Sequence, residues 1–238
     1  MRAHRVRALL MGGQACVFYG AAEFSRDTNL AILADAANLA RLRKALGDLQ
    51  AEPIAVPPFQ LNYLRKGHAI HFRCQHPDAF QMRVDVMSVM RGVDPFPKLW
   101  KRRVTIELPD LTLCDLLSLP DLVQAKKTQR DKDWPMIRRL VEAHYFQNRQ
   151  KPTPQQIKFW LTQLRTPELL HSLATCHASV CRRRMPTRPA LVPALTGNMS
   201  GLEQALMDEE RFERERDKSY WLPLRRELEI LRHGLRLR

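Results

Sequence analysis

The sequence predicts an α+β fold, in which a small mixed β-sheet flanked by helices is followed by a helical C-terminal region. Two observations in the first half predict the sheet and its helices: some segments alternate apolar and polar residues with the two-residue period of strands, and others space apolar residues as helices do. Beyond Lys151 the strand patterns stop, and Thr-Pro pairs typical of helix starts take their place. We therefore expect a first domain over residues 1–150 and a helical region over residues 151–238.

The first expected strand, residues 6–11, is a short apolar run that ends at two adjacent glycines, Gly12 and Gly13. A helix is expected to begin at this turn. Because glycine has no side chain, backbone N–H groups at such a turn can approach an anion at the helix N-terminus. The glycine pair therefore favours a phosphate-binding turn, although a Gly-Gly pair alone is weak evidence.

The second expected strand, residues 25–33, has two different faces. Its alternation places Leu30 and Ile32 on one face, and Asp27 and Asn29 on the other. Three further elements are expected along the chain: a helix over residues 36–49, a strand over residues 68–73 and a strand over residues 82–89.

Asp85 lies between Val84 and Val86 on the last of these strands. A buried acid without a partner costs several kcal/mol, so this carboxylate needs a partner cation, a metal ion or a position at the sheet edge. A purely structural, hydrogen-bonded Asp is the simpler alternative.

A hairpin is expected over residues 104–114, with Pro109 and Asp110 in its turn. Ser118 and Asp121 then have the spacing of a capping box, which predicts a helix over residues 119–134. This helix must break or kink before Pro135, because proline cannot continue a helical hydrogen-bond ladder.

On that predicted helix, the apolar stripe continues into Lys126, Arg130 and Asp133. Cations on the extension of a buried face favour a bound anion at that place. A solvated face, with the side-chain stems lying on apolar surface, is the open alternative.

The C-terminal half is expected to be helical. Thr153 and Thr166 each precede a proline and are expected to cap short helices. Residues 185–200 contain several prolines and are expected to form a linker or exposed loop. Ser200 is expected to cap a charged helix, and residues 221–236 form a basic amphipathic one.

Composition narrows the classes of partner and compartment. Lys and Arg number 39 and Asp and Glu 25, which gives a net charge of +14 over 238 residues and favours a polyanionic partner, with a generally basic surface as the alternative. The five cysteines include no C-x-x-C pair, so we expect a reduced, cytoplasmic protein. No segment is apolar enough to predict a signal peptide or a membrane span. The spacing of four helical residues disfavours a zinc site at His171, Cys176, His177 and Cys181.

Together, Gly12 and Gly13, the Asp27-Thr28-Asn29 strand and Asp85 on a later strand resemble the motif of the polymerase-beta-like minimal nucleotidyltransferase superfamily. The segment around Lys126 resembles a helix of the toxin-type nucleotidyltransferases linked to abortive infection. The resemblance covers about residues 5–145.

The resemblance implies a nucleotidyltransferase that moves a nucleoside monophosphate from a nucleoside triphosphate, such as ATP, to an acceptor hydroxyl. It implies that Gly12, Gly13 and Ser25 bind the triphosphate and that Lys126 and Arg130 neutralise charge on the leaving pyrophosphate. RNA, including a tRNA 3′ end, is the acceptor that the positive charge favours. A toxin-antitoxin or phage-defence setting, with a cognate antitoxin as partner, is also implied.

The resemblance further implies a Mg²⁺ or Mn²⁺ site made by Asp27, Asn29 and Asp85, with Asp27, Asp85 and Lys126 as the catalytic residues. Asn29 departs from the family pattern, which has an acid there. This change predicts weaker Mg²⁺ binding or loss of catalysis, and a shift towards Mn²⁺ is a further expected outcome. Family members also place a helix before the first strand, so we expect either C-terminal helices on that face or a start further upstream.

Two other functions stay open at this point. A catalytically inactive protein with the nucleotidyltransferase fold would act as an RNA- or protein-binding module, and Asn29 is its main support. An enzyme that nucleotidylates proteins or aminoglycosides would need an acidic pocket for a cationic substrate, which so basic a chain disfavours.

Overall fold

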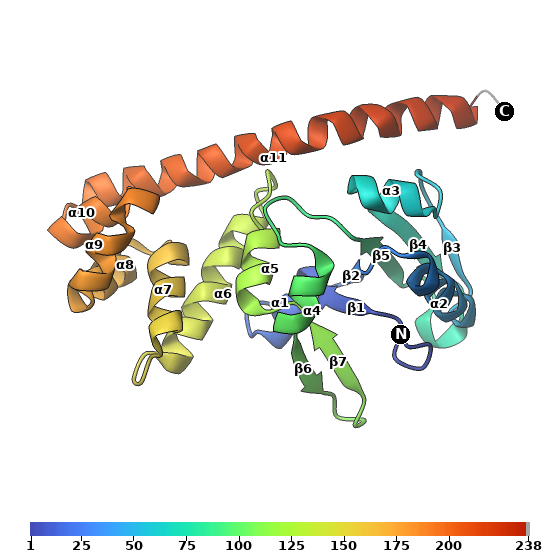
Figure 1. The fold of residues 1–238 in the computed structure, drawn as a ribbon, viewed down its shortest axis with the longest axis horizontal. Helices are drawn as coiled ribbons and strands as arrows, with labels where there is room; N and C mark the ends of the chain where they lie inside the picture. The colour runs from blue at the N-terminus through green and yellow to red at the C-terminus, as the bar shows by residue number, and fades with distance from the viewer. Residues whose placement is uncertain (237–238) are drawn as a thin grey trace. The chain divides into compact units, whose positions relative to one another are not determined.

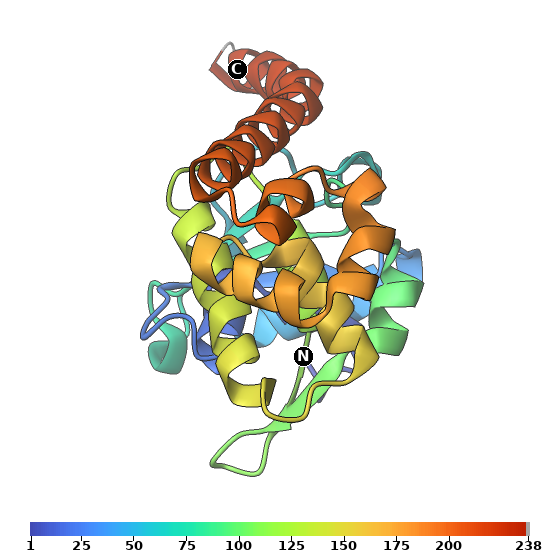
Figure 2. The ribbon, with the colours of Figure 1, turned by 90° about the vertical axis from the view of Figure 1, so that its left-hand side faces the viewer.

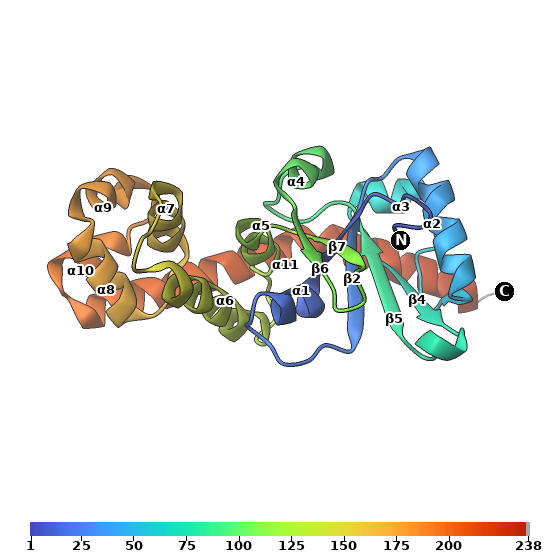
Figure 3. The same cartoon turned by 90° about the horizontal axis from the view of Figure 1, so that it is seen from below.

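The strands of the first half form one mixed, seven-stranded sheet (Figures 1 and 3). We describe a computed structural model that gives the backbone of residues 1–236 and the side chains of residues 1–234. The strand order is β3-β4-β5-β2-β1-β7-β6. The strands are β1 (Ala8–Met11), β2 (Asp27–Ile32), β3 (Ala51–Pro53), β4 (Ile70–Cys74), β5 (Arg83–Met87), β6 (Val104–Glu107) and β7 (Leu113–Leu116).

Strand pairing gives the centre of the sheet its mixed character. β2 runs antiparallel to β1 and parallel to β5, whereas β4 runs antiparallel to both β3 and β5. β7 lies parallel to β1 and antiparallel to β6, so the expected hairpin is confirmed.

The two faces of β2 and β5 differ as the alternation predicts. Leu30, Ile32, Val84 and Val86 are buried on one face and form part of the apolar core. On the opposite face, the side chains of β2 and β5 are polar at the start of the strands. A fold with a mixed sheet, flanking helices and a helical C-terminal region is therefore confirmed.

The chain divides into two compact units, residues 1–125 together with the chain from Ser219 onward, and residues 126–218. The first division falls at residue 125, whereas the sequence predicted a boundary at residue 150. Helices of the first unit are α1 (Gly12–Phe18), α2 (Ala36–Asp48), α3 (Leu61–Lys66), α4 (Phe96–Arg102) and α5 (Leu119–Ala125), with a 3₁₀ turn η1 (Pro77–Ala79).

The second unit is helical (Figure 2). Its elements are α6 (Asp133–Asn148), α7 (Pro154–Gln163), α8 (Pro167–Cys176), α9 (Ala178–Arg184), the 3₁₀ turn η2 (Met185–Thr187), α10 (Leu191–Thr196) and the first part of α11 (Met199–Arg236). The expected capping box at Thr153 is present, because its hydroxyl accepts the N–H of Gln156, 3.3 Å away, and the Gln156 side chain accepts the N–H of Thr153.

Three sequence predictions about the helices are wrong. The helix expected over residues 119–134 is two helices, α5 and α6, because residues 126–132 fold into a loop. The expected linker, residues 185–200, is mostly helical, since Leu191 and Ala194 on α10 are buried.

The third error concerns α11, for which two separate helices were expected. It is one continuous helix that contains Pro223. Asn198, rather than Ser200, caps its start, because the Asn198 Oδ1 accepts the N–H of Gly201 at 3.0 Å. Among residues 1–236, no helix has the length and apolar character needed to cross a membrane.

Candidate functional site

The Gly-Gly turn packs directly against Asn29, on β2, and Ser25, which lies just before that strand. A Cβ on Gly12, which has a φ of +69°, would lie 2.8 Å from Nδ2 of Asn29. A Cβ on Gly13 would lie 2.9 Å from the Cβ of Ser25 and closer still to its hydroxyl oxygen. The two glycines are therefore required by close packing, and they bring the start of α1 next to Ser25 and Asn29.

The predicted metal-binding residues lie on one face of two adjacent strands. In the parallel pairing of β2 and β5, Asn29 is opposite Asp85, and Asp27 is opposite Arg83. Neighbouring strands are about 4.8 Å apart, and residues two apart on a strand share a face. The structure thus brings Asp27, Asn29 and Asp85 together on the polar face of the sheet. Figure 3 shows the two neighbouring strands, β2 and β5, that hold them.

Asp27 has a carboxylate that is not engaged by other side chains. Within residues 1–234, no hydrogen bond or ion pair is made by its carboxylate, which is partly exposed. Its backbone carbonyl, in contrast, accepts the Ser25 hydroxyl at 3.2 Å and the Asn29 amide at 3.4 Å. Two neighbouring side chains therefore fix the backbone of Asp27 and leave its carboxylate available to a ligand.

Asp85 is held by two basic partners, Arg83 and His71. Its Oδ1 accepts from Nε of Arg83 at 2.8 Å and lies 2.7 Å from Nδ1 of His71, the residue opposite it on β4. Burial raises the pKa of this carboxyl, but hydrogen bonds and positive charge from His71 and Arg83 outweigh it and hold the pKa below its ordinary value. Of the three alternatives that the sequence left open for Asp85, a partner cation, a metal ion or an edge position, the structure shows a partner cation, Arg83.

His71 and Arg83 were not assigned a role from the sequence. His71 lies between the buried Ile70 and Phe72, as Asp85 lies between two buried valines. A polar residue between two apolar ones on neighbouring strands is a signal that could have linked His71 to Asp85. Arg83, two residues before Asp85, lies on the same face of the strand, so its spacing could have linked it to Asp85.

Asp27, Asn29 and Asp85 suit a metal ion that takes its remaining ligands from a nucleotide. Among the described residues, no group of three His, Cys, Asp or Glu side chains could hold a metal ion. Mg²⁺ is often bound through one or two carboxylates together with substrate phosphates. Asp27 and Asp85 provide two carboxylates and Asn29 an amide oxygen, which suits an ion that arrives with a triphosphate.

Lys126 and Arg130, the predicted phosphate-neutralising cations, lie in the second unit and contact an acid there. Nζ of Lys126 is 2.9 Å from Oδ1 of Asp133, and Nε of Arg130 is 2.7 Å from its Oδ2. The hydroxyl of Thr128 donates to the same Oδ2 at 2.6 Å. Inside this unit, the positive charges of Lys126 and Arg130 are thus paired with a buried carboxylate.

The environment of Asp133 is that of a structural ion pair. Burial raises the pKa of its carboxyl, but the charge of Lys126, the Thr128 hydroxyl and the charge of Arg130 together lower the pKa below its ordinary value. The sequence predicted one helical stripe through Lys126, Arg130 and Asp133. Instead, residues 126–132 fold around the carboxylate at the start of α6, because both of its oxygens need partners in a buried position.

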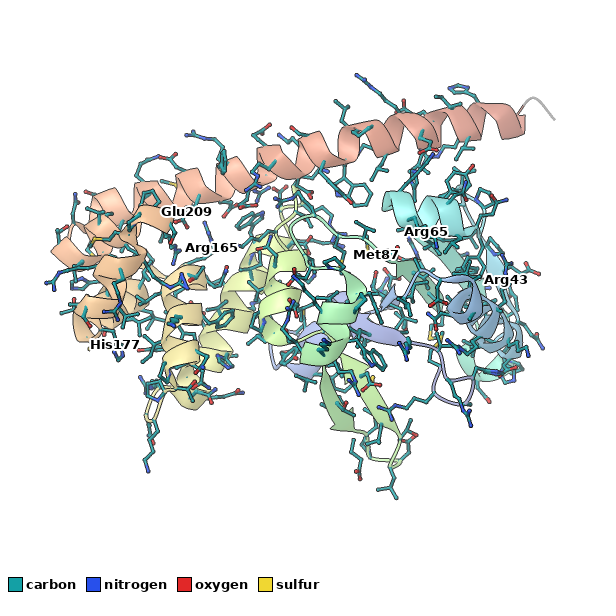
Figure 4. The ribbon with its side chains drawn as sticks, in the orientation of Figure 1. Arg43, Arg65, Met87, Arg165, His177 and Glu209 are labelled. Atoms are coloured by element: carbon teal, nitrogen blue, oxygen red, sulfur yellow. The ribbon has the colours of Figure 1, made fainter. Side chains whose placement is uncertain are left out.

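A groove of about 540 Å³ in the second unit was not predicted. It is lined partly by Trp134, and the guanidinium groups of Arg165 and Arg214 lie 4.8 and 5.7 Å from the centre of this ring. Both arginines are already paired, Arg165 with Glu209 (Figure 4) and Arg214 with Glu210. The groove is therefore a weaker candidate for a charged ligand than the polar face of the sheet.

No family model matches this chain, and the search of curated proteins gave no match. Its function therefore has to be inferred from its own residues. Six of the eight predicted site residues gather at one end of the sheet in the first unit, and they make up the candidate site: Gly12, Gly13, Ser25, Asp27, Asn29 and Asp85.

Proposed function

We propose that the first unit binds a nucleoside triphosphate and transfers its monophosphate part to an acceptor hydroxyl. The observation that supports this function is the gathering of the Gly-Gly turn, an unengaged carboxylate on Asp27 and a second carboxylate on Asp85 at one end of the polar face. These are the groups that nucleotidyl transfer needs near a triphosphate.

The reaction forms a bond between the acceptor oxygen and the α-phosphorus and breaks the bond between the α-phosphorus and the oxygen that bridges to the β-phosphate. Pyrophosphate leaves, and the proton of the acceptor hydroxyl passes to water. Asp27 and Asp85 would hold the divalent ion, Mg²⁺ or Mn²⁺, which supplies positive charge against the phosphates when it is bound. Ser25, whose hydroxyl lies against Gly13, would donate to a phosphate oxygen in place of the Asp27 carbonyl, to which it donates in this structure. Arg83 and His71 keep the Asp85 carboxyl ionised and in place, since both contact its Oδ1.

With Asn29 in place of an acid, the site carries one negative charge fewer. Two opposite unit charges about 4 Å apart attract each other by roughly 4 kcal/mol at an effective dielectric constant near 20, and an amide oxygen retains part of this. We therefore expect weaker metal binding than an acid at position 29 would give, and a measurable difference between Mg²⁺ and Mn²⁺.

RNA is the acceptor that the charge of +14 favours, because a basic protein attracts the phosphate backbone. A catalytically inactive RNA- or protein-binding module is the second candidate function. It is favoured by Asn29 and by the two basic side chains, Arg83 and His71, that already contact Oδ1 of Asp85.

The test is label transfer from radiolabelled nucleoside triphosphates to total bacterial RNA, with Mg²⁺ or with Mn²⁺. Wild type is compared with Asp27→Ala and Asn29→Asp, and Asp78→Ala serves as a control for loss of an exposed carboxylate. Transfer by the wild type that Asp27→Ala abolishes supports the enzyme. Transfer only by Asn29→Asp identifies a site that has lost catalysis, and no transfer by any variant favours the binding module.

A further inference from the structure

We propose that the second unit binds single-stranded RNA through an acid-poor surface on α7, α9 and the connection between α6 and α7. This inference rests on the proposed function, in which RNA is the acceptor, and adds where the RNA is held. The acid-poor surface consists of six side chains: Arg149, Lys151, Lys158, Arg182, Arg183 and Arg184.

Charge is separated within the second unit. Residues 126–218 contain 18 Lys and Arg and 11 Asp and Glu, a net charge of +7. Residues 143–202 alone contain eight Lys and Arg and a single acid, Glu168, which is also +7. The rest of the unit is therefore neutral, and all of its excess positive charge lies in the segment from the end of α6 to the start of α11.

Two of the eight cations in this segment point inward. Arg188 is buried, donates to the carbonyls of Leu161 and Leu164 at 2.9 and 2.7 Å, and pairs with Glu209 at 3.0 Å. Arg165 lies 3.5 Å from the same Glu209. These two therefore hold the helices together and leave the six cations of the acid-poor surface for another role.

The six cations have no acid to neutralise them. Five of them are exposed and Arg184 is partly exposed, and none makes an ion pair with any acid in residues 1–234. Cations on the first half of α11 differ, because Arg211, Arg216 and Lys218 each pair with an acid three residues earlier.

The short run of arginines is more than a helix-end effect. Cations in the last turn of α9 interact favourably with the helix dipole. That effect does not account for the near absence of acids over residues 143–202, which is what a surface for a polyanion needs.

An exposed aromatic ring favours single-stranded RNA as the polyanion. Phe146, near the end of α6, is 50% exposed, and the guanidinium of Arg149 lies 5.2 Å from its ring centre. Unpaired bases stack on such rings, whereas the bases of a duplex are already stacked. Contacts between α7 and α8, α8 and α9, and α7 and α9 gather these helices in one bundle (Figure 2).

The experiment measures fluorescence anisotropy of a labelled single-stranded RNA of about 20 nucleotides with the full chain, in EDTA and without nucleotide, over a series of KCl concentrations. The test variant is Arg182→Gln/Arg183→Gln/Arg184→Gln. The matched control is Arg211→Gln/Arg216→Gln/Lys218→Gln, which removes the same charge from the same unit. Circular dichroism and thermal unfolding check that both variants fold.

We expect the test variant to lower the slope of log K against log salt by about 2, because each phosphate contact contributes about 0.7 for a single strand. The control should retain the wild-type slope, and Phe146→Ala should weaken binding to the single strand more than to duplex RNA. No binding by the wild type, or equal losses in the two triple variants, would overturn the proposal, as would stronger binding to anionic vesicles than to RNA. Because the assay contains no metal and no nucleotide, its outcome is independent of whether the first unit is an enzyme.

Discussion

Asp85 in the first unit, which is partly buried, and Asp133 in the second, which is buried, are both acids with two basic partners, but they differ in which oxygens are left free. Both oxygens of Asp133 are bonded, Oδ1 by Lys126 and Oδ2 by Thr128 and Arg130. At Asp85 both partners contact Oδ1, and Oδ2 makes no hydrogen bond within residues 1–234. An acid whose two carboxylate oxygens both accept hydrogen bonds has a structural role. An acid that keeps one oxygen free, beside a second carboxylate without partners, can still bind a ligand.

The largest effect is expected from Asp133→Ala. Removing this carboxylate leaves the buried ammonium of Lys126 without its partner, and breaking a buried pair in this way costs about 3 kcal/mol or more. Urea unfolding measures the change in the free energy of unfolding. Asp131→Ala is the control, because that carboxylate is 99% exposed and its pair with Arg214 is a surface one. Equal losses in the two variants would contradict a structural role for Asp133.

An intermediate effect on stability is expected from Gly13→Ala, which tests the close packing of Gly13 against Ser25 in the candidate site. The new methyl group would overlap the Ser25 side chain, and such overpacking costs about 1–3 kcal/mol. Adding Ser25→Gly should recover part of this loss, because the overlap is removed. Gly47→Ala on α2 is the control: its Cβ would meet nothing within 4 Å, so a helix gains stability there. A loss in Gly13→Ala that Ser25→Gly does not reduce would show that the contact is not the cause.

The local features of the site could be predicted from the sequence, because a two-residue period sets the face of every strand residue. Asp27 and Asn29 on one face, the partner cation of Asp85 and the turn at Gly12 all follow from short spacings. Strand pairing is set by contacts far apart in the chain, so the row that joins Asn29, Asp85 and His71 could not be predicted.

Helix boundaries were predicted less well where tertiary contacts override local patterns. The segment from Lys126 to Asp133 has helical spacing, yet a buried carboxylate draws residues 126–132 into a loop around it. Residues 185–200 have the prolines of a linker, but the burial of Leu191 and Ala194 stabilises a helix there. The short β3 and α3 complete too few periods to give a pattern at all.

The smallest effect on stability is expected from Asp85→Asn, and this effect should depend on pH. The folded-state pKa of both carboxyls is lowered, so the ionised form stabilises the fold above the ordinary pKa near 3.9, and this stability is lost as pH falls through the lower folded-state pKa. The difference between wild type and Asp85→Asn should therefore be small at pH 7 and shrink towards zero in acid. Arg83 is 39% exposed, so solvent screens its attraction for Asp85.

For nucleotide binding, the order of the two effects should be reversed, with the larger loss from the change at Asp85 and none from the change at Asp133. If Asp85 keeps a free oxygen for a metal ion, Asp85→Asn should abolish the Mg²⁺-dependent part of nucleotide binding while changing stability little, as measured by titration calorimetry with and without EDTA. Asp133→Asn should do the opposite, with a large loss of stability and no change in the affinity of the protein that remains folded. An equal loss of stability in Asp85→Asn and Asp133→Asn would contradict this difference, because Asp85 would then stabilise the fold as Asp133 does rather than keep an oxygen free for a ligand.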